Sequence, residues 1–202
     1  VFLSALKLVK EFRYLFSDQA DMTKKGNLFC YTEVEFSFLY KTPELKNEEK
    51  SRFDGLALVV GGGKIKDACI FEMKYGSAKI EKEQIEKYVK LAKILGIQKI
   101  ISVSNQFVTK PTDYPVPINT KKWNGQLYHF SWSYVVFLAQ ILLKKNGTDI
   151  EDIDQQNIMS EVVRYLQGCG GIKHFDSMKT TEKWHTLVND LASIYVKPEY
   201  KK

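Results

Sequence analysis

The sequence predicts an α/β protein, in which a mixed β-sheet is flanked by helices. Two β-rich runs flank the glycines at 61–63, an amphipathic helical pattern follows at 78–96, and a further short apolar run begins at Gln98. The glycines indicate a hairpin, whose strands are antiparallel, while a strand, helix and strand in succession indicate a right-handed crossover between parallel strands. Together these observations predict a sheet with both kinds of pairing.

The remaining elements are predicted from the spacing of apolar residues. Residues 3–16 carry apolar side chains at helical intervals, and residues 28–40 alternate and are rich in β-formers. The helix at 78–96 is expected to stop at Gly96. These elements make up a predicted core over residues 1–125.

The C-terminal part of the chain, residues 126–202, is predicted to be a helical accessory region that packs on the core within one structural domain. Helical patterns occur at 133–145, 151–167 and 181–195. Between this region and the last predicted strand lies an irregular connection that holds three of the five prolines, Pro111, Pro115 and Pro117.

Composition limits the environment and the partners. The chain has 202 residues, 44% of them hydrophobic, so it can bury one substantial core. A net charge of +6 permits an anionic partner such as nucleic acid without requiring one. Three cysteines with no metal-ligand spacing predict a reducing, intracellular (cytoplasmic) location, and the longest apolar run is too short to cross a membrane. The first residue is Val1 rather than Met, which is expected of an excerpt of a larger parent chain or of a processed product.

The segment CIFEMKYG, residues 69–76, reads as a buried strand that carries two charged side chains. Because side chains alternate along a strand, Glu72 and Lys74 share one face, and Phe71 and Met73 point to the other. If the hairpin turn centres on Gly63, Asp54 lies opposite Glu72 on the neighbouring strand. The sequence therefore predicts two carboxylates and one lysine on a single patch.

This set of side chains suits metal-assisted hydrolysis of a phosphodiester. Asp54 and Glu72 offer hard oxygen ligands for Mg²⁺ or Mn²⁺, and the carbonyl group of Met73, between the motif side chains, offers another. Lys74 supplies a cation near an attacking water molecule or the scissile phosphate.

The arrangement resembles the PD-(D/E)XK nuclease superfamily. The matching residues are Asp54 in RFDG, then Glu72 and Lys74 in EMK, then a helix in which QIEKY places Gln84 and Tyr88 one turn apart. The last pair is similar to the Gln-x-x-x-Tyr element of the branch that includes the nuclease domains of bacterial recombination exonucleases. The resemblance spans about 28–107 and implies a restriction-endonuclease-like core. It also implies metal bound by Asp54 and Glu72, and Gln84 and Tyr88 facing the metal site or DNA.

Two features depart from the signature or leave it incomplete. Phe53 stands where the signature has proline, although the ligand itself is the aspartate. The superfamily often adds an upstream acid, and Glu11, Glu33 and Glu35 are all candidates.

Other interpretations remain open beside this one. An isolated Glu-x-Lys is usually a solvated pair on an antiparallel sheet, and the fold could serve as a catalytically inactive module that binds a protein or a nucleic acid. The segment VVGGGKIK lacks the full phosphate-loop pattern. We expect structural or exposed positions for His129, His174 and His185, and core or interface positions for Trp123, Trp132 and Trp184.

Overall fold

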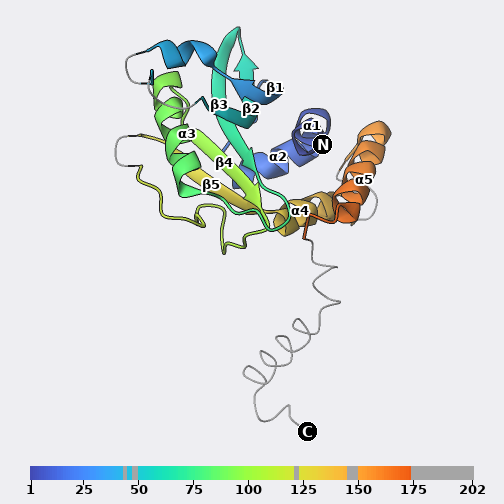
Figure 1. The fold of residues 1–202 in the computed structure, drawn as a ribbon. Helices are drawn as coiled ribbons and strands as arrows, with labels where there is room; N and C mark the ends of the chain where they lie inside the picture. Colours follow the sequence, from blue (N-terminus) through green and yellow to red (C-terminus); the bar gives the residue numbers. More distant parts are fainter. Residues whose placement is uncertain (43–44, 47–49, 121–122, 145–149, 174–202) are drawn as a thin grey trace, which may run out of the picture.

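The computed structural model describes residues 1–42, 45–46, 50–120, 123–144 and 150–173, which form a mixed sheet with helices on both faces (Figure 1). Its five strands lie in the order of the sequence: β1 (Asn27–Glu35), β2 (Arg52–Gly61), β3 (Lys64–Met73), β4 (Lys99–Ser104) and β5 (Gln126–Ser131). The helices are α1 (Phe2–Leu8), α2 (Lys10–Gln19), α3 (Lys82–Leu95), α4 (Trp132–Lys144) and α5 (Ile153–Gly168), with a 3₁₀ helix at Ser37–Lys41.

Strand β3 joins the two kinds of pairing. It is antiparallel to β2 and parallel to β4, and β5 continues the parallel part. The parallel connection from β3 to β4 passes through α3, which ends at Gly96 with a φ of 69°. The prediction of an α/β protein with a mixed sheet is therefore confirmed, as is the glycine that ends the helix.

The β2–β3 hairpin brings Asp54 opposite Glu72 by a different route from the one predicted. The turn consists of Gly62 and Gly63, with φ values of 59° and 70°, rather than being centred on Gly63 alone. Such a turn, continued regularly, would place Asp54 opposite Phe71. Lys66 is bypassed at a bulge, so the ladder shifts by one residue and pairs Gly55 with Phe71. The next position along the ladder then sets Asp54 against Glu72.

Two apolar layers cover the two faces of the sheet. On one face, aromatic rings from α1, α2, α4 and the strands pack together; for example, the ring centroids of Phe16 and Phe130 are 4.5 Å apart, and those of Phe2 and Trp132 are 6.0 Å apart. On the other face, α3 packs Ile85 and Tyr88 against the strands. Because β3 and β4 are covered on both sides, polar groups on them are removed from water unless they point to the edge of the sheet.

Several predicted boundaries are wrong. The single helix over 3–16 is broken at Val9, whose φ of −107° and ψ of 104° are extended. The strand expected over 28–40 stops at Glu35, and the 3₁₀ helix follows. The segment that begins at Gln126 is not helical at first, because it forms β5 and completes the sheet. The helix predicted at 181–195 lies outside the described residues.

The predicted helices at 133–145 and 151–167 correspond to α4 and α5. Trp123 and Trp132 are buried, as expected, whereas Trp184 is outside the described residues. The three cysteines are all free thiols. Within the described part of the chain, no helix combines the length and apolar character needed to cross a membrane.

Candidate functional site

Four of the five predicted site residues form a closed ring of polar contacts on the α3 side of the sheet. Lys74 Nζ lies 2.7 Å from Glu72 Oε1 and donates to Gln84 Oε1 at 2.8 Å. Gln84 Nε2 donates to the hydroxyl oxygen of Tyr88 at 3.1 Å, and that hydroxyl group lies 2.8 Å from Glu72 Oε2. The structure thus joins the Glu-x-Lys strand to the Gln-x-x-x-Tyr helix through side chains.

Asp54, the fifth predicted residue, is held beside this ring. Its Oδ2 accepts a hydrogen bond of 2.7 Å from the backbone N–H of Met73, the residue between Glu72 and Lys74. Asp54 is half-buried, and its negative charge acts on Glu72. The backbone hydrogen bond therefore fixes one carboxylate next to the other across the β2–β3 ladder.

The backbone of Lys74 is held on both sides. Its N–H donates to the carbonyl oxygen of Val103 on β4, and its own carbonyl oxygen accepts from the indole N–H of Trp132 at the start of α4, both at 2.8 Å. These bonds fix the backbone just after β3, while the Lys74 side chain keeps 22% of its surface exposed. The Lys74 side chain is therefore only partly enclosed.

Glu72 is the most deeply buried charged residue among those described, with only 1% of its surface exposed. Burial raises the pKa of its carboxyl group, and the hydrogen bonds from Lys74 and Tyr88 counteract that rise. Burial and the anionic Glu72 in turn raise the pKa of the Tyr88 phenol, so Tyr88 remains a proton donor. A solvated surface pair would leave the glutamate in water, so that interpretation does not describe Glu72.

The polar row extends beyond the residues that the sequence singled out. Glu72 pairs with Ser102 on β4, which pairs with His129 on β5, so the three lie side by side across the sheet. His129 Nε2 lies 3.0 Å from the carbonyl oxygen of Gln106, which can only accept, so this nitrogen carries the proton. Nδ1 therefore accepts from Ser102 Oγ at 2.8 Å.

Sequence reasoning missed this extension. His129 has no acid close in the sequence, and its neighbours become visible only through the parallel register of β3, β4 and β5. Burial lowers the pKa of His129, which fits the neutral tautomer. His174 and His185 lie outside the described residues.

None of the three candidate upstream acids is joined to the ring by a hydrogen bond or ion pair between described residues. Glu33 lies between the paired residues Thr32 and Val34, hence across from Asp54, but its carboxylate lies 2.7 Å from Arg52 Nε. Glu35 contacts Ser37 and Lys50. Glu11 lies on α2, and its Oε2 is buried without a hydrogen-bond partner among the described residues.

The oxygens present suit a hard divalent cation in kind but are few in number. Asp54 and Glu72 supply carboxylates, and Met73 supplies a carbonyl group, the donor types that Mg²⁺ and Mn²⁺ prefer. Among the described residues, no group of three or more His, Cys, Asp and Glu side chains is placed to hold a metal ion. A site built here would therefore rely on water molecules, as Mg²⁺ sites commonly do.

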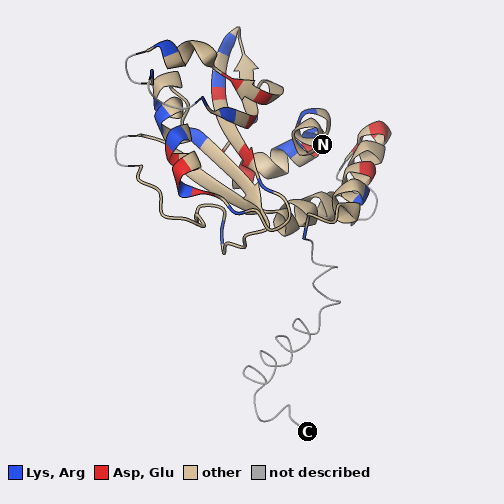
Figure 2. Cartoon of the chain, viewed as in Figure 1, with Lys and Arg blue, Asp and Glu red and all other residues tan. Residues whose placement is uncertain are grey.

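A small polar cavity opens onto the ring. It has a volume of about 280 Å³ and is lined by Gln84 and Tyr88 of the ring and by Lys50, Ser51, Arg52, Glu81, Glu83 and Lys87. Its lining contains both acidic and basic side chains, and Figure 2 likewise shows both signs of charge mixed along α3 and the hairpin strands. The cavity therefore does not lie in a broad basic face.

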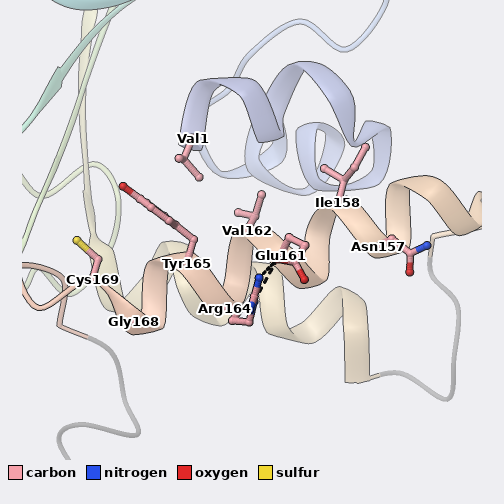
Figure 3. A pocket seen from close by; sticks show the side chains of 9 residues that line it. All are labelled: Val1, Asn157, Ile158, Glu161, Val162, Arg164, Tyr165, Gly168 and Cys169. Atoms are coloured by element: carbon pink, nitrogen blue, oxygen red, sulfur yellow. Dashed lines mark hydrogen bonds and ion pairs between the residues drawn. The ribbon is translucent and has the colours of Figure 1, made fainter.

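A larger cavity, of about 820 Å³, lies elsewhere, between the start of α1 and α5 (Figure 3). Val1, Val162 and Tyr165 line it, with Glu161 and Arg164 paired on its rim. None of the five predicted site residues contributes to its lining. Two of the five, Gln84 and Tyr88, instead line the smaller cavity.

Comparison with known proteins does not assign this chain to a family. No protein-family model matches the chain, and no curated protein sequence matches it.

Proposed function

We propose that this protein is a Mg²⁺- or Mn²⁺-dependent nuclease of PD-(D/E)XK type, with a restriction-endonuclease-like core and with DNA as its favoured substrate. The observation that supports this proposal most strongly is the ring of Glu72, Lys74, Gln84 and Tyr88 beside Asp54. Five residues from two strands and a helix converge there, and their order in the sequence is that of the superfamily signature.

Each residue has a definite task in the proposed reaction. Asp54 and Glu72, with the carbonyl group of Met73, would hold the ion, which when bound acidifies a water molecule and offsets charge at the scissile phosphate. Lys74 positions the attacking water or helps to remove its proton. Gln84 orients the Lys74 amine through their 2.8 Å hydrogen bond, and Tyr88 orients Glu72.

A catalytically inactive module that binds a protein or a nucleic acid is the second candidate. The observation that favours it is that both oxygens of Glu72 are already bonded, to Lys74 and to Tyr88. In this case the ring would only stabilise the fold. The two candidates differ in whether the ring binds metal.

Cleavage of single-stranded and duplex DNA in Mn²⁺ tests the proposal. The intact protein should cut, and Glu72→Gln, which keeps the size of the side chain and removes its charge, should not. Calorimetric titration of the same two proteins with Mn²⁺ provides a second measurement. If the folded protein neither cuts DNA nor binds millimolar Mn²⁺, the inactive module is the better assignment.

A further inference from the structure

A third cavity begins at His129, the residue on β5 at the end of the row formed with Glu72 and Ser102. It has a volume of about 510 Å³ and lies between the end of α2, the segment after β4, the end of β5, and α4. His129, the last member of the row, is one of its lining residues. This volume is typical of sites for small ligands or for one group of a larger ligand.

The lining of this cavity is aromatic. Phe107, Phe130, Tyr134 and Phe137 all contribute to it. Phe107 keeps 75% of its surface exposed and Phe137 keeps 41%, so apolar ring surface faces solvent at a point where a ligand could cover it. Flat rings of this kind favour a flat aromatic ligand. For a nucleic acid base, such stacking does not depend on which base is present.

The polar part of the lining suits a guest that carries hydrogen-bonding groups and is attached to an anion. Gln19, Thr109 and Ser131 offer donors and acceptors. Among the described residues the lining contains one cation, Lys110, and no acidic side chain; Asp113, 3.8 Å from the Lys110 amine, is not part of the lining. A nucleobase on a phosphate backbone has this combination of properties.

The position of the cavity fits the same guest. The backbone of His129 on β5 lies two strands from that of Glu72 on β3, about 10 Å at the usual spacing of strands, although Phe130 and Tyr134 of the cavity face the opposite side of the sheet, so a nucleic acid strand would reach them around the edge strand β5. At about 3.4 Å per nucleotide in a stacked strand, this distance corresponds to a few nucleotides. A strand whose scissile phosphate lies at Glu72 could therefore place a nearby base in the cavity.

We propose that the cavity lined by Phe107, Lys110 and Phe137 binds one unpaired base of the nucleic acid strand that is cut at Glu72. This inference rests on the proposed nuclease function and extends it to the substrate, because a base can enter the cavity only when it has left its duplex. Single-stranded DNA, or a frayed end, is then preferred over an intact duplex.

Binding measurements on the Glu72→Gln variant in Mg²⁺ test this inference without cleavage. Fluorescence anisotropy with labelled single-stranded oligonucleotides would compare this background with the added change Phe107→Ala or Tyr165→Ala. Tyr165 is the matched control, because it is 57% exposed and lines the other cavity. Since Phe107 is exposed, its replacement should leave the fold intact, which circular dichroism can verify.

Phe107→Ala should weaken binding about tenfold, the effect expected from the loss of one base–aromatic stack, and Tyr165→Ala should not. An abasic nucleotide at one position of the oligonucleotide should cause a similar loss with Phe107 present and little further loss with Phe107→Ala. Equal binding by the two variants would overturn this inference, and an apolar peptide would be the better guest. If the intact protein still cuts DNA in Mn²⁺, the proposed function survives that result; if it neither binds nor cuts, both proposals fail.

Discussion

The hydroxyl group of Tyr88 lies 2.8 Å from Glu72 Oε2 and 2.9 Å from the carbonyl oxygen of Arg52. The hydroxyl has one proton for these two acceptors, because Gln84 donates to its oxygen and takes none away. While Glu72 is ionised, one acceptor at a time receives the proton. When Glu72 is protonated it can donate to Tyr88, which then donates to Arg52, so a proton on Glu72 completes the network.

The stability of the protein should therefore depend on pH through Glu72. Its pKa is raised in the folded state, so the folded state binds the proton more readily and the free energy of unfolding falls as pH rises through the folded pKa. Relative to Glu72→Gln, the intact protein should gain stability as pH is lowered from 7 toward 4.5, the ordinary pKa of a glutamate. The gain is about 1.4 kcal/mol for each unit by which the pKa of Glu72 in the folded state exceeds that in the unfolded state. Urea unfolding in EDTA measures this difference. A pH-independent difference would contradict the prediction.

Replacing Tyr88 by Phe should lower stability and move the pH profile of activity. The change removes the Tyr88 donor from Oε2 of the buried Glu72, which costs about 1–3 kcal/mol. Because the lost bond lowered the pKa of Glu72, the acid limb of the cleavage profile should shift to higher pH. Tyr165→Phe is the control, since Tyr165 on α5 is 57% exposed and lies outside the ring. Equal losses in the two variants would argue against a specific role for Tyr88.

Lys74→Met should slow cleavage strongly, and Lys99→Met should not. Lys99 forms a comparable pair with Asp67 at 2.9 Å on β3 and β4, with side chains 15% and 8% exposed, but outside the ring. Both variants lose a partly buried ion pair and should lose stability. Only Lys74→Met should slow cleavage, by at least about 100-fold, as measured by initial rates in Mn²⁺. Similar activity in the two variants would remove Lys74 from the mechanism.

Gly63→Ala should destabilise the hairpin and leave the chemistry of the ring unchanged. The φ of 70° at Gly63 lies in the left-handed region, where a side chain costs about 1–2 kcal/mol, although nothing described lies close enough to clash with the added carbon. Thermal unfolding should show the loss, and Mn²⁺ binding at low temperature should be retained. Lys64→Ala, at the exposed residue after the turn, provides a control of small effect.

Local signals predicted those parts of the molecule that are contiguous in the sequence. The glycines of the hairpin, the apolar spacing of α3 and the stop at Gly96 each act over a few residues, and the structure contains all three. Asp54 and Glu72 could be placed opposite one another from the hairpin alone. Yet the predicted centre of the turn was Gly63, whereas the observed centre lies between Gly62 and Gly63. The bulge at Lys66 compensates for this difference and restores the predicted register.

Long-range pairing could not be predicted in the same way. The segment from Gln126 to Ser131 was included in a helical region because long apolar runs follow it, whereas its strand conformation depends on the open edge of β4. The proximity of Ser102 and His129 to Glu72 follows from the same pairing. Likewise, no proline or glycine in the sequence marks the break between α1 and α2 at Val9.

The contact between Gly76 and Gly171 has a consequence for how the protein is made. The N–H of Gly76, just after the strand that carries Glu72 and Lys74, donates to the carbonyl oxygen of Gly171 at 2.8 Å, and Asn105 donates to the same oxygen. On a ribosome the hairpin would emerge long before Gly171 does. The turn that follows the strand with Glu72 and Lys74 can make this last contact only when the end of α5 has been synthesised, so during co-translational folding Gly76 would lack this bond until nearly all of the described chain has left the exit tunnel.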